Sequence, residues 1–250
     1  MNVLTVACCI AFAIMALGLL LSWLMRQSLF SLEAIVVQGD VVHNNAVTLR
    51  ANVAPRLAGN FFTVDLARTQ SLFETIPWVR KAVVQREFPN RLKVTLQEHE
   101  AVAYWDQQGD ARLINRYGEV FEANMGDVEA DELPQLKGPP GQAQLVLQVY
   151  QTLAPVLEHH DNVLAGLELT TQGSWRAELD SGATLELGHG TAPEVQARVQ
   201  RFLTTLTQVA SRFDRDLESA DLRYGNGYAL RLKGVTTMAP DENDDKKARR

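Results

Sequence analysis

The sequence predicts an α+β protein: a single amino-terminal transmembrane helix, a small βααββ module, and a mixed α+β domain with an antiparallel sheet and two helices. Three observations carry this prediction. Residues 3–25 contain no charged side chain, and residues 76–98 alternate apolar and polar side chains around a proline turn. From residue 100 onward, short strand patterns and turn residues surround two amphipathic helical segments. We expect four parts: a transmembrane anchor over residues 1–28, the βααββ module over residues 30–99, the mixed α+β domain over residues 100–235, and a disordered charged tail over residues 236–250.

The first 25 residues favour a membrane anchor that is retained. As a helix, the 23 residues from Val3 to Met25 span about 35 Å, which exceeds a bilayer core of about 30 Å. A cleaved signal peptide is the alternative, but it needs a basic start and a small-residue cleavage site. No Lys or Arg precedes Arg26, and Trp23 suits the membrane interface. Only Met1 and Asn2 precede this segment.

Cysteine and charge set limits on the rest of the chain. Cys8 and Cys9 are the only cysteines, so the residues after the apolar segment form no disulfide, which leaves the redox compartment open. The net charge is +2 over residues 26–100 and −8 over residues 101–240. An acidic body argues against nucleic acid as a partner, because phosphate binding needs a basic surface.

The βααββ module is predicted from residue 31 onward. Residues 31–38 form a strand, which Gly39-Asp40 ends, and residues 45–57 are loosely helical. Asp65 caps a second helix that Pro77 terminates. The hairpin over residues 76–98 follows, and its second strand places three side chains on the buried face: Leu92, Val94 and Leu96.

The second domain combines short strands with two helices. The strands are expected over residues 102–105, 112–115, 120–121, 164–170, 175–180, 183–187, 220–224 and 228–233. The first helix covers residues 142–153, and Pro155 ends or bends it. The second begins at a capping box of Thr191 and Glu194. Its apolar stripe packs on the sheet, with Arg198 and Arg201 off the stripe: Val195, Val199, Phe202, Leu203, Leu206, Val209 and Phe213.

No motif in the chain indicates catalysis. The five histidines are scattered without metal-ligand spacing, and no nucleophile elbow, zinc-protease motif or phosphate-binding loop is present. We therefore predict that the protein is not an enzyme and that it has no catalytic, cofactor-binding or metal-binding residues. A membrane-anchored envelope hydrolase remains the alternative, because a fold can bring two distant carboxylates together.

The last predicted strand, over residues 228–233, is a candidate for binding another chain. A terminal strand often lies at a sheet edge, where unpaired backbone groups can accept a partner strand. The alternative is an edge that Arg231 and Lys233 protect from pairing.

An ordered set of motifs runs through the chain and carries a family resemblance. The order βααββ resembles the POTRA domain, a module found outside the bacterial cytoplasmic membrane. Together with the later landmarks, the set resembles the FtsQ/DivIB family of bacterial cell-division proteins. The motifs lie at residues 60–66, 76–79, 82–86, 88–92, 98, 101–105, 118–121, 133–139, 175, 185–188, 198, 201–202 and 221–224.

The resemblance implies a non-catalytic scaffold of the divisome. Such a protein crosses the inner membrane once, has its bulk in the periplasm at the division septum, and binds FtsB and, with it, FtsL and other divisome membrane proteins. It implies no small-molecule substrate. A POTRA-type envelope assembly or transport chaperone is the rival, although such proteins usually carry several modules.

The resemblance also implies a set of partner-binding residues. Arg223 and Tyr224 match the family's Leu-Arg-Tyr motif, and Gly227 lies in the following turn. Leu232 stands where the family commonly has Trp, which removes an aromatic anchor of the kind that dominates interfaces. The full set of expected partner-binding residues is Arg223, Tyr224, Asn226, Gly227, Tyr228, Leu230 and Leu232.

Overall fold

The structure is a computed structural model in which the chain divides into two compact units. The first unit comprises residues 1–100 and 122–127, and the second comprises residues 101–121 and 128–250. The described residues are 3–25, 31–39, 41–57, 59–107, 110–124, 126, 128, 133–213, 215–225 and 227–234. The predicted charged tail, residues 236–250, lies outside them.

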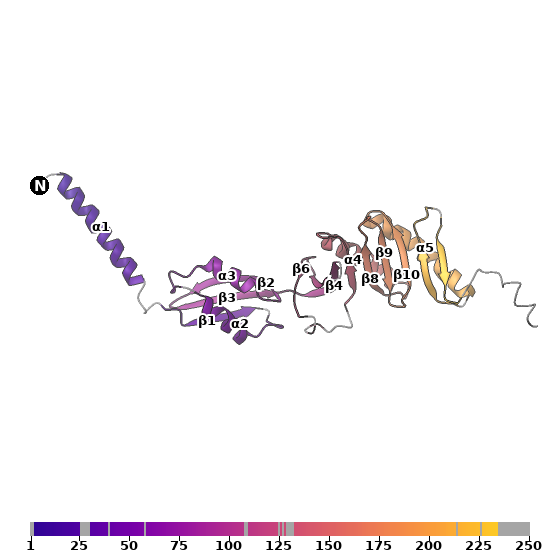
Figure 1. The fold of residues 1–250 in the computed structure, drawn as a ribbon, viewed down its shortest axis with the longest axis horizontal. Coiled ribbons are helices and arrows are strands. Elements are labelled where there is room, and N and C mark those ends of the chain that lie inside the picture. Colours follow the sequence, from indigo (N-terminus) through magenta and orange to yellow (C-terminus); the bar gives the residue numbers. More distant parts are fainter. Residues whose placement is uncertain are drawn as a thin grey trace, which may run out of the picture. The chain divides into compact units, whose positions relative to one another are not determined.

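The amino-terminal apolar segment is helical. Helix α1 covers Val3–Met25 (Figure 1), and its described side chains are exposed. Of the helices within the described residues, none meets both the length and the hydropathy required to cross a membrane. The predicted single membrane span therefore stays a prediction.

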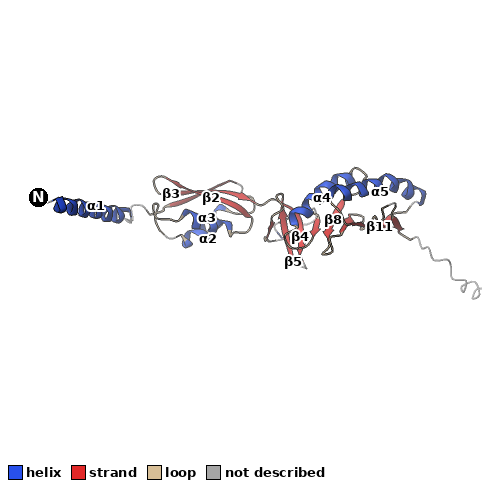
Figure 2. Ribbon diagram, turned by 90° about the horizontal axis from the view of Figure 1, so that it is seen from above, coloured by secondary structure: helices blue, strands red, loops and turns tan. Residues whose placement is uncertain are grey.

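The first unit has the predicted order of strand, two helices and two strands. Its elements are β1 (Ala34–Gly39), α2 (Ala46–Val53) with the short 3-10 helix η2 (Ala54–Arg56), α3 (Leu66–Glu74), β2 (Val79–Glu87) and β3 (Arg91–Glu98). The central strand is β3, which pairs in parallel with β1 and antiparallel with β2. Helices α2 and α3 cover one face of this sheet (Figure 2).

The buried face of β3 is the one that the alternating pattern predicts. Leu92, Val94 and Leu96 are all buried and pack with Phe73 of α3. The predicted cap of α3 is also present, because the Arg68 N–H donates to the Asp65 carboxylate over 3.0 Å. The helix ends at Glu74, shortly before Pro77, as a following proline requires.

Glu98 fastens the loop after β1 to the end of β3. Its carboxylate accepts hydrogen bonds from the backbone N–H groups of Val42, His43 and Asn44, over 3.0, 3.0 and 3.1 Å. The Asn44 amide donates to it over 2.9 Å, and the His43 Nδ1 lies 3.2 Å away. His43 also stacks on Trp78, with ring centroids 3.8 Å apart. With a side chain only 5% exposed, Glu98 is held by these donors in place of water.

The second unit is built on one sheet of nine strands. Its strands are β4 (Ala101–Gln107), β5 (Asp110–Asn115), β6 (Val120–Phe121), β7 (Gln135–Lys137), β8 (Leu164–Leu169), β9 (Trp175–Leu179), β10 (Thr184–Gly188), β11 (Leu217–Asp221) and β12 (Ala229–Leu232). Their order is β12-β11-β10-β9-β8-β7-β4-β5-β6. Helices α4 (Ala143–Glu158) and α5 (Ala192–Phe213) lie along the same face of the sheet (Figure 2).

The sheet is mixed, which corrects the expectation of an antiparallel sheet. The pairs β4–β7, β7–β8 and β10–β11 are parallel, and the other described pairs are antiparallel. A parallel pair needs a long crossover, and a helix commonly supplies it. Helix α4 makes that connection between β7 and β8, and α5 makes it between β10 and β11. The sequence patterns predict both helices, but not that the strands they connect are parallel.

The main further differences from the sequence-based expectation concern α4, β7 and β11. Helix α4 continues through Pro155 to Glu158, where Leu153 and Leu157 stay fully buried on either side of the proline. Strand β7 was missed because three residues are too few for a period of two to be visible. Strand β11 begins at Leu217 and ends at Asp221, so the motif around Arg223 lies after the strand rather than inside it.

Helix α5 packs as its apolar stripe predicts, as far as its side chains are described. Val195, Val199, Phe202 and Leu203 are buried in the same core as β9 and β10. The capping box is seen in part, because the Thr191 N–H donates to the Glu194 carboxylate over 2.8 Å. This bond is the main reason that the pKa of Glu194 is lowered. The side chains of Val209 and Phe213 lie outside the described residues.

We predict that Glu98→Gln destabilises the first unit by about 2 kcal/mol, because an amide cannot accept from all the donors that the carboxylate serves. Native-state hydrogen exchange of the β3 amides measures this opening free energy without contribution from the second unit. The matched control is Glu87→Gln. Glu87 pairs with Arg91 at 3.4 Å on the surface, and its loss should cost less than about 0.5 kcal/mol. Equal effects of the two substitutions would contradict this account of Glu98.

Candidate functional site

Strand β12 is the edge strand that the sequence predicts. It pairs with β11, and within the described residues no strand pairs with its other side. Its side chains alternate, so that Leu230 and Leu232 point into the unit while Ala229 and Arg231 are exposed. Leu232 is 8% exposed, so its side chain belongs to the interior and only its backbone can meet a partner strand.

The outer edge of β12 presents the backbone groups of Leu230 and Leu232. The Lys233 N–H donates to the Asp216 carbonyl over 2.9 Å, so the backbone of Lys233 points toward β11. Backbone polar groups alternate between the two sides of an antiparallel strand. Ala229 and Arg231 therefore bond toward β11, opposite Asp221 and Ser219. The N–H and C=O groups of Leu230 and Leu232 face outward.

The charges on this edge are only partly engaged. Arg231 lies 3.8 Å from Glu218, and both side chains are largely exposed. The Lys233 ammonium donates to the Ser181 carbonyl over 3.4 Å. An exposed ion pair at this distance holds its partners weakly. The edge is therefore charged, as a protected edge would be, and the contacts that its two cations make within the described residues are to Glu218 and Ser181 rather than to the backbone of β12.

Arg223 is fixed by Asp221 at the end of β11. The guanidinium donates to the Asp221 carboxylate through Nε at 2.9 Å and Nη2 at 2.6 Å, and the Arg223 N–H donates over 3.1 Å. These bonds to Arg223 lower the pKa of Asp221 from its ordinary value. They raise the pKa of Arg223 in turn. Gly188 permits this arrangement, since a Cβ there would lie 3.0 Å from both Arg198 and Arg223.

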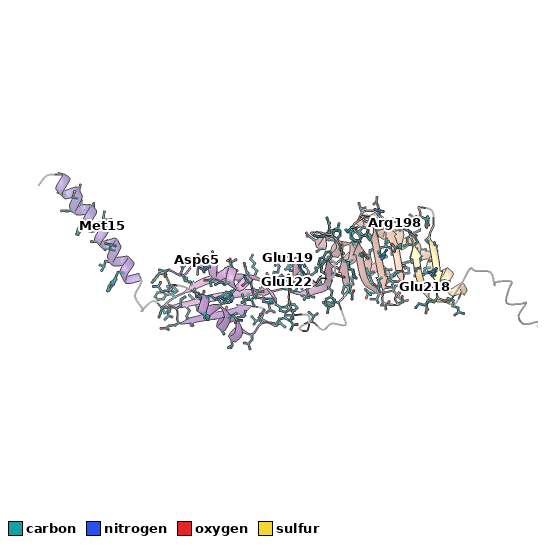
Figure 3. All side chains as sticks on the ribbon, viewed as in Figure 1. Met15, Asp65, Glu119, Glu122, Arg198 and Glu218 are labelled. Carbon is teal, nitrogen blue, oxygen red and sulfur yellow. The ribbon has the colours of Figure 1, made fainter. Side chains whose placement is uncertain are left out.

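A cavity of about 370 Å³ lies between α5 and the connection from β11 to β12. Two arginines from α5, Arg198 and Arg201, line it together with the exposed connection that contains Tyr224. No acidic residue is among the described residues that line it, which are Arg198, Arg201, Phe202, Thr205, Leu222, Tyr224, Gly225, Gly227 and Tyr228. Figure 3 places Arg198 and Glu218 at opposite ends of this part of the sheet.

Helix α5 holds the connection in place through three side chains. The Arg201 guanidinium donates to the Gly225 carbonyl over 3.1 Å. The Thr205 hydroxyl and the Tyr228 hydroxyl are hydrogen-bonded, and Phe202 meets Tyr228 edge-to-face at 5.2 Å. Tyr228 is therefore anchored and half-buried, whereas Tyr224 is 60% exposed.

The predicted partner-binding residues fall into three groups. Arg223, Tyr224 and Gly227 lie in the exposed connection, and Tyr228 anchors it. Leu230 and Leu232 form the edge through their backbones. Asn226 lies outside the described residues. Sequence reasoning did not assign Arg201 or Thr205 to the site. Both are polar positions outside the apolar stripe of α5, and Arg201 also belongs to a motif of the family resemblance.

The described residues contain no group of three or more His, Cys, Asp or Glu side chains arranged to hold a metal ion. The site is thus an edge of unpaired backbone groups, an exposed tyrosine and a cavity with two cations. This chemistry suits the binding of an extended polypeptide.

Comparison with known families agrees with this arrangement. Residues 30–99 match the POTRA domain of the FtsQ type, and residues 103–223 match the carboxyl-terminal domain of cell division protein FtsQ/DivIB. The chain belongs to the FtsQ/DivIB family of cell-division proteins. The second match ends at Arg223, so Tyr224 and β12 lie just beyond it.

Relatives of the FtsQ/DivIB family align over most of the chain. Cell division protein FtsQ of Thiomonas arsenitoxydans is 40% identical over 94% of this chain and 88% of its own length. The FtsQ protein of Burkholderia pseudomallei is 38% identical over 90% and 88%, and that of Bordetella pertussis is 34% identical over 92% and 89%. The family assignment identifies this chain as a cell-division protein, as the sequence motifs predicted.

We predict that the carboxyl group of Asp221 titrates below its ordinary value of 3.8 and that Arg223→Ala returns the midpoint toward 3.8. Because the pKa is lowered in the folded state, the pairing stabilises the connection above the ordinary pKa. That stabilisation is lost as pH falls through the lowered pKa. Carbon NMR of the Asp221 carboxyl measures the midpoint. Arg231→Ala is the control and should leave it unchanged, and an unchanged midpoint in Arg223→Ala would refute the assignment.

Proposed function

We propose that this protein is a non-catalytic scaffold of the divisome that binds FtsB, and with it FtsL, through the edge of its second unit. A segment of FtsB adds to β12 as a further strand, next to the exposed Tyr224. The scaffold is anchored in the inner membrane by residues 3–25, with its bulk on the periplasmic side at the division septum. The observation that carries the proposal is the open outer edge of β12.

Strand addition fits the geometry of this edge. The outward N–H and C=O groups of Leu230 and Leu232 supply the main-chain hydrogen bonds for one additional strand. Four residues are a short edge by themselves, so side-chain contacts must contribute as well. Tyr224 is well suited to this, since an exposed tyrosine offers a large contact area with little loss of conformational entropy on binding.

The neighbouring cavity sets the expected charge of the partner segment. Arg198 and Arg201 line the cavity, and each already donates a hydrogen bond to a backbone carbonyl, at His189 and Gly225. A guanidinium has five N–H donors, so both arginines retain donors for another acceptor. A carboxylate beside the added strand would pair with them, and we infer that the partner segment carries an acidic side chain there.

The anchor is part of the proposal and rests on the sequence. Twenty-three consecutive residues, Val3–Met25, carry no charge and are dominated by large apolar side chains. The described side chains of α1 are exposed, with Ile10, Phe12 and Leu19 each more than half exposed. A lipid environment is the solvent in which such a helix is stable.

Two carboxyl groups of the second unit have pKa shifts that do not suit a general acid. Glu194 and Asp221 both have lowered pKa values, caused by hydrogen bonds from Thr191 and Arg223. A hydrolase that uses a carboxylic acid as proton donor needs a raised pKa instead. Both groups serve as structural acceptors, one at a helix start and one at a strand end.

We predict that Tyr224→Ala weakens FtsB capture by at least about tenfold, because a central exposed tyrosine is a typical interface hot spot. Affinity is measured by titrating the periplasmic part of FtsB against the full chain in detergent. The matched control is Tyr117→Ala, which removes a tyrosine of the same unit that is 46% exposed on the turn after β5. It should leave the affinity within about twofold.

A second substitution separates the strand edge from the cavity. Arg201→Glu, on the exposed face of α5, should reduce capture further if the partner contributes a carboxylate, and an Arg in the facing position of FtsB should then restore it. Unchanged affinity in Tyr224→Ala would show that the partner binds elsewhere. Loss in Tyr117→Ala to the same extent would show that the effect is not specific to this edge.

A further inference from the structure

Three phenylalanines form an exposed aromatic cluster at one end of the first unit. Phe61 is buried and meets Phe62 and Phe88 edge-to-face, with ring centroids 5.2 and 6.3 Å away. Phe88 is 77% exposed in the turn between β2 and β3, and Phe62 is 41% exposed. Two exposed aromatic rings that pack on the same buried ring form an apolar surface feature of the kind that marks a contact site.

The cluster is held rigidly by Arg86. Its guanidinium donates to the backbone carbonyls of Phe61, Phe62 and Val64, over 2.7, 3.3 and 2.8 Å. This ties the turn at residues 61–64 to strand β2, immediately before Phe88. The Asn60 side chain also accepts from the N–H groups of Phe62 and Thr63, each over 3.0 Å. The rings are therefore preorganised, which lowers the entropy cost of a contact.

The cluster lies at the end of the unit where the chain enters from α1. Ala34 pairs with Arg91, and the Glu33 N–H donates to the Asn90 carbonyl over 3.0 Å, so Ser31–Glu33 run beside the Phe88 turn. Five residues, 26–30, separate Ser31 from the end of α1. Fully extended, they reach at most about 22 Å. If α1 is the anchor, the cluster cannot be far from the bilayer surface.

The opposite end of the same unit has a different chemistry. There Gly39 pairs with Leu96, and Val42 and His43 bond to Glu98. Strand β3, which runs from Arg91 to Glu98, separates the two ends by about 23 Å. Val42, 85% exposed at that far end, is thus a matched apolar position outside the reach of a membrane-bound cluster.

We propose that Phe62 and Phe88 insert into the interface of the bilayer that holds α1, and so fix the orientation of the first unit on the membrane. This rests on the proposed anchor. Exposed aromatic rings on a short tether suit the lipid headgroup region, where apolar rings are stabilised. The two charges that flank the Phe88 turn compensate one another, since Arg91 pairs with Glu87 at 3.4 Å. The contact is therefore carried by the rings and changes little with ionic strength.

The test is photochemical and uses the full chain in vesicles of phosphatidylethanolamine and phosphatidylglycerol. The photoreactive residue p-benzoylphenylalanine replaces Phe88, Val42 or Met15 in three separate variants. It keeps an aromatic ring at position 88, and the exposure of that position leaves the fold undisturbed. Irradiation is followed by mass spectrometry of lipid adducts. We expect adducts at positions 15 and 88, with the yield at position 88 at least about fivefold above that at position 42.

The outcomes distinguish this inference from the anchor itself. Adducts at position 15 with none above background at position 88 would overturn the lipid contact and leave the anchor intact. No adducts at position 15 would refute the anchor, and the inference would fall with it. Crosslinks at position 88 to protein in place of lipid would likewise overturn the proposal. Phe62→Ser should reduce the lipid adducts at position 88 at least about twofold, whereas 0.5 M salt should not.

Discussion

The crossover by α5 is the constraint on which the second unit depends. Strands β10 and β11 are parallel, so the chain must return along the sheet before β11 can pair, and α5 makes that return. Strand β12 then forms one edge of the sheet. The buried face of α5 packs Val195, Val199 and Phe202 on the sheet. Outside this face, Arg201 and Thr205 hold the connection that precedes β12. One helix thus sets both the position of the edge and the shape of the cavity beside it.

The two ends of the first unit show how the same small sheet can support different roles. At one end, the Glu98 carboxylate accepts hydrogen bonds from three backbone N–H groups of the loop after β1. At the other, Arg86 satisfies the backbone of residues 61–64 and leaves the rings of Phe62 and Phe88 exposed. In both cases one side chain forms hydrogen bonds with several backbone groups of a turn or loop. At the Glu98 end the polar groups of the loop are engaged in hydrogen bonds, whereas at the Arg86 end two apolar rings are exposed on the surface.

Local patterns predicted the elements well but not their three-dimensional consequences. The alternation of Leu92, Val94 and Leu96, the Asp65 cap and the stripe of α5 each express a period that a few residues define. Three other features depend on the elements that pack around them. They are the parallel direction of β7, the continuation of α4 through Pro155, and the end of β11 at Asp221, before the motif at Arg223. The site divides in the same way. The motif at Arg223 and Tyr224 was visible in the sequence, whereas the hydrogen bonds of Arg201 and Thr205 to the connection required the fold.

The central claim is that β12 binds its partner as an added strand, and amide hydrogen exchange tests it most directly. The N–H groups of Leu230 and Leu232 face outward, while those of Ala229 and Arg231 already point toward β11. On addition of saturating FtsB, the account predicts that exchange slows at least about tenfold at Leu230 and Leu232 and changes little at Ala229 and Arg231. A complex that forms with no slowing at Leu230 and Leu232 would contradict it.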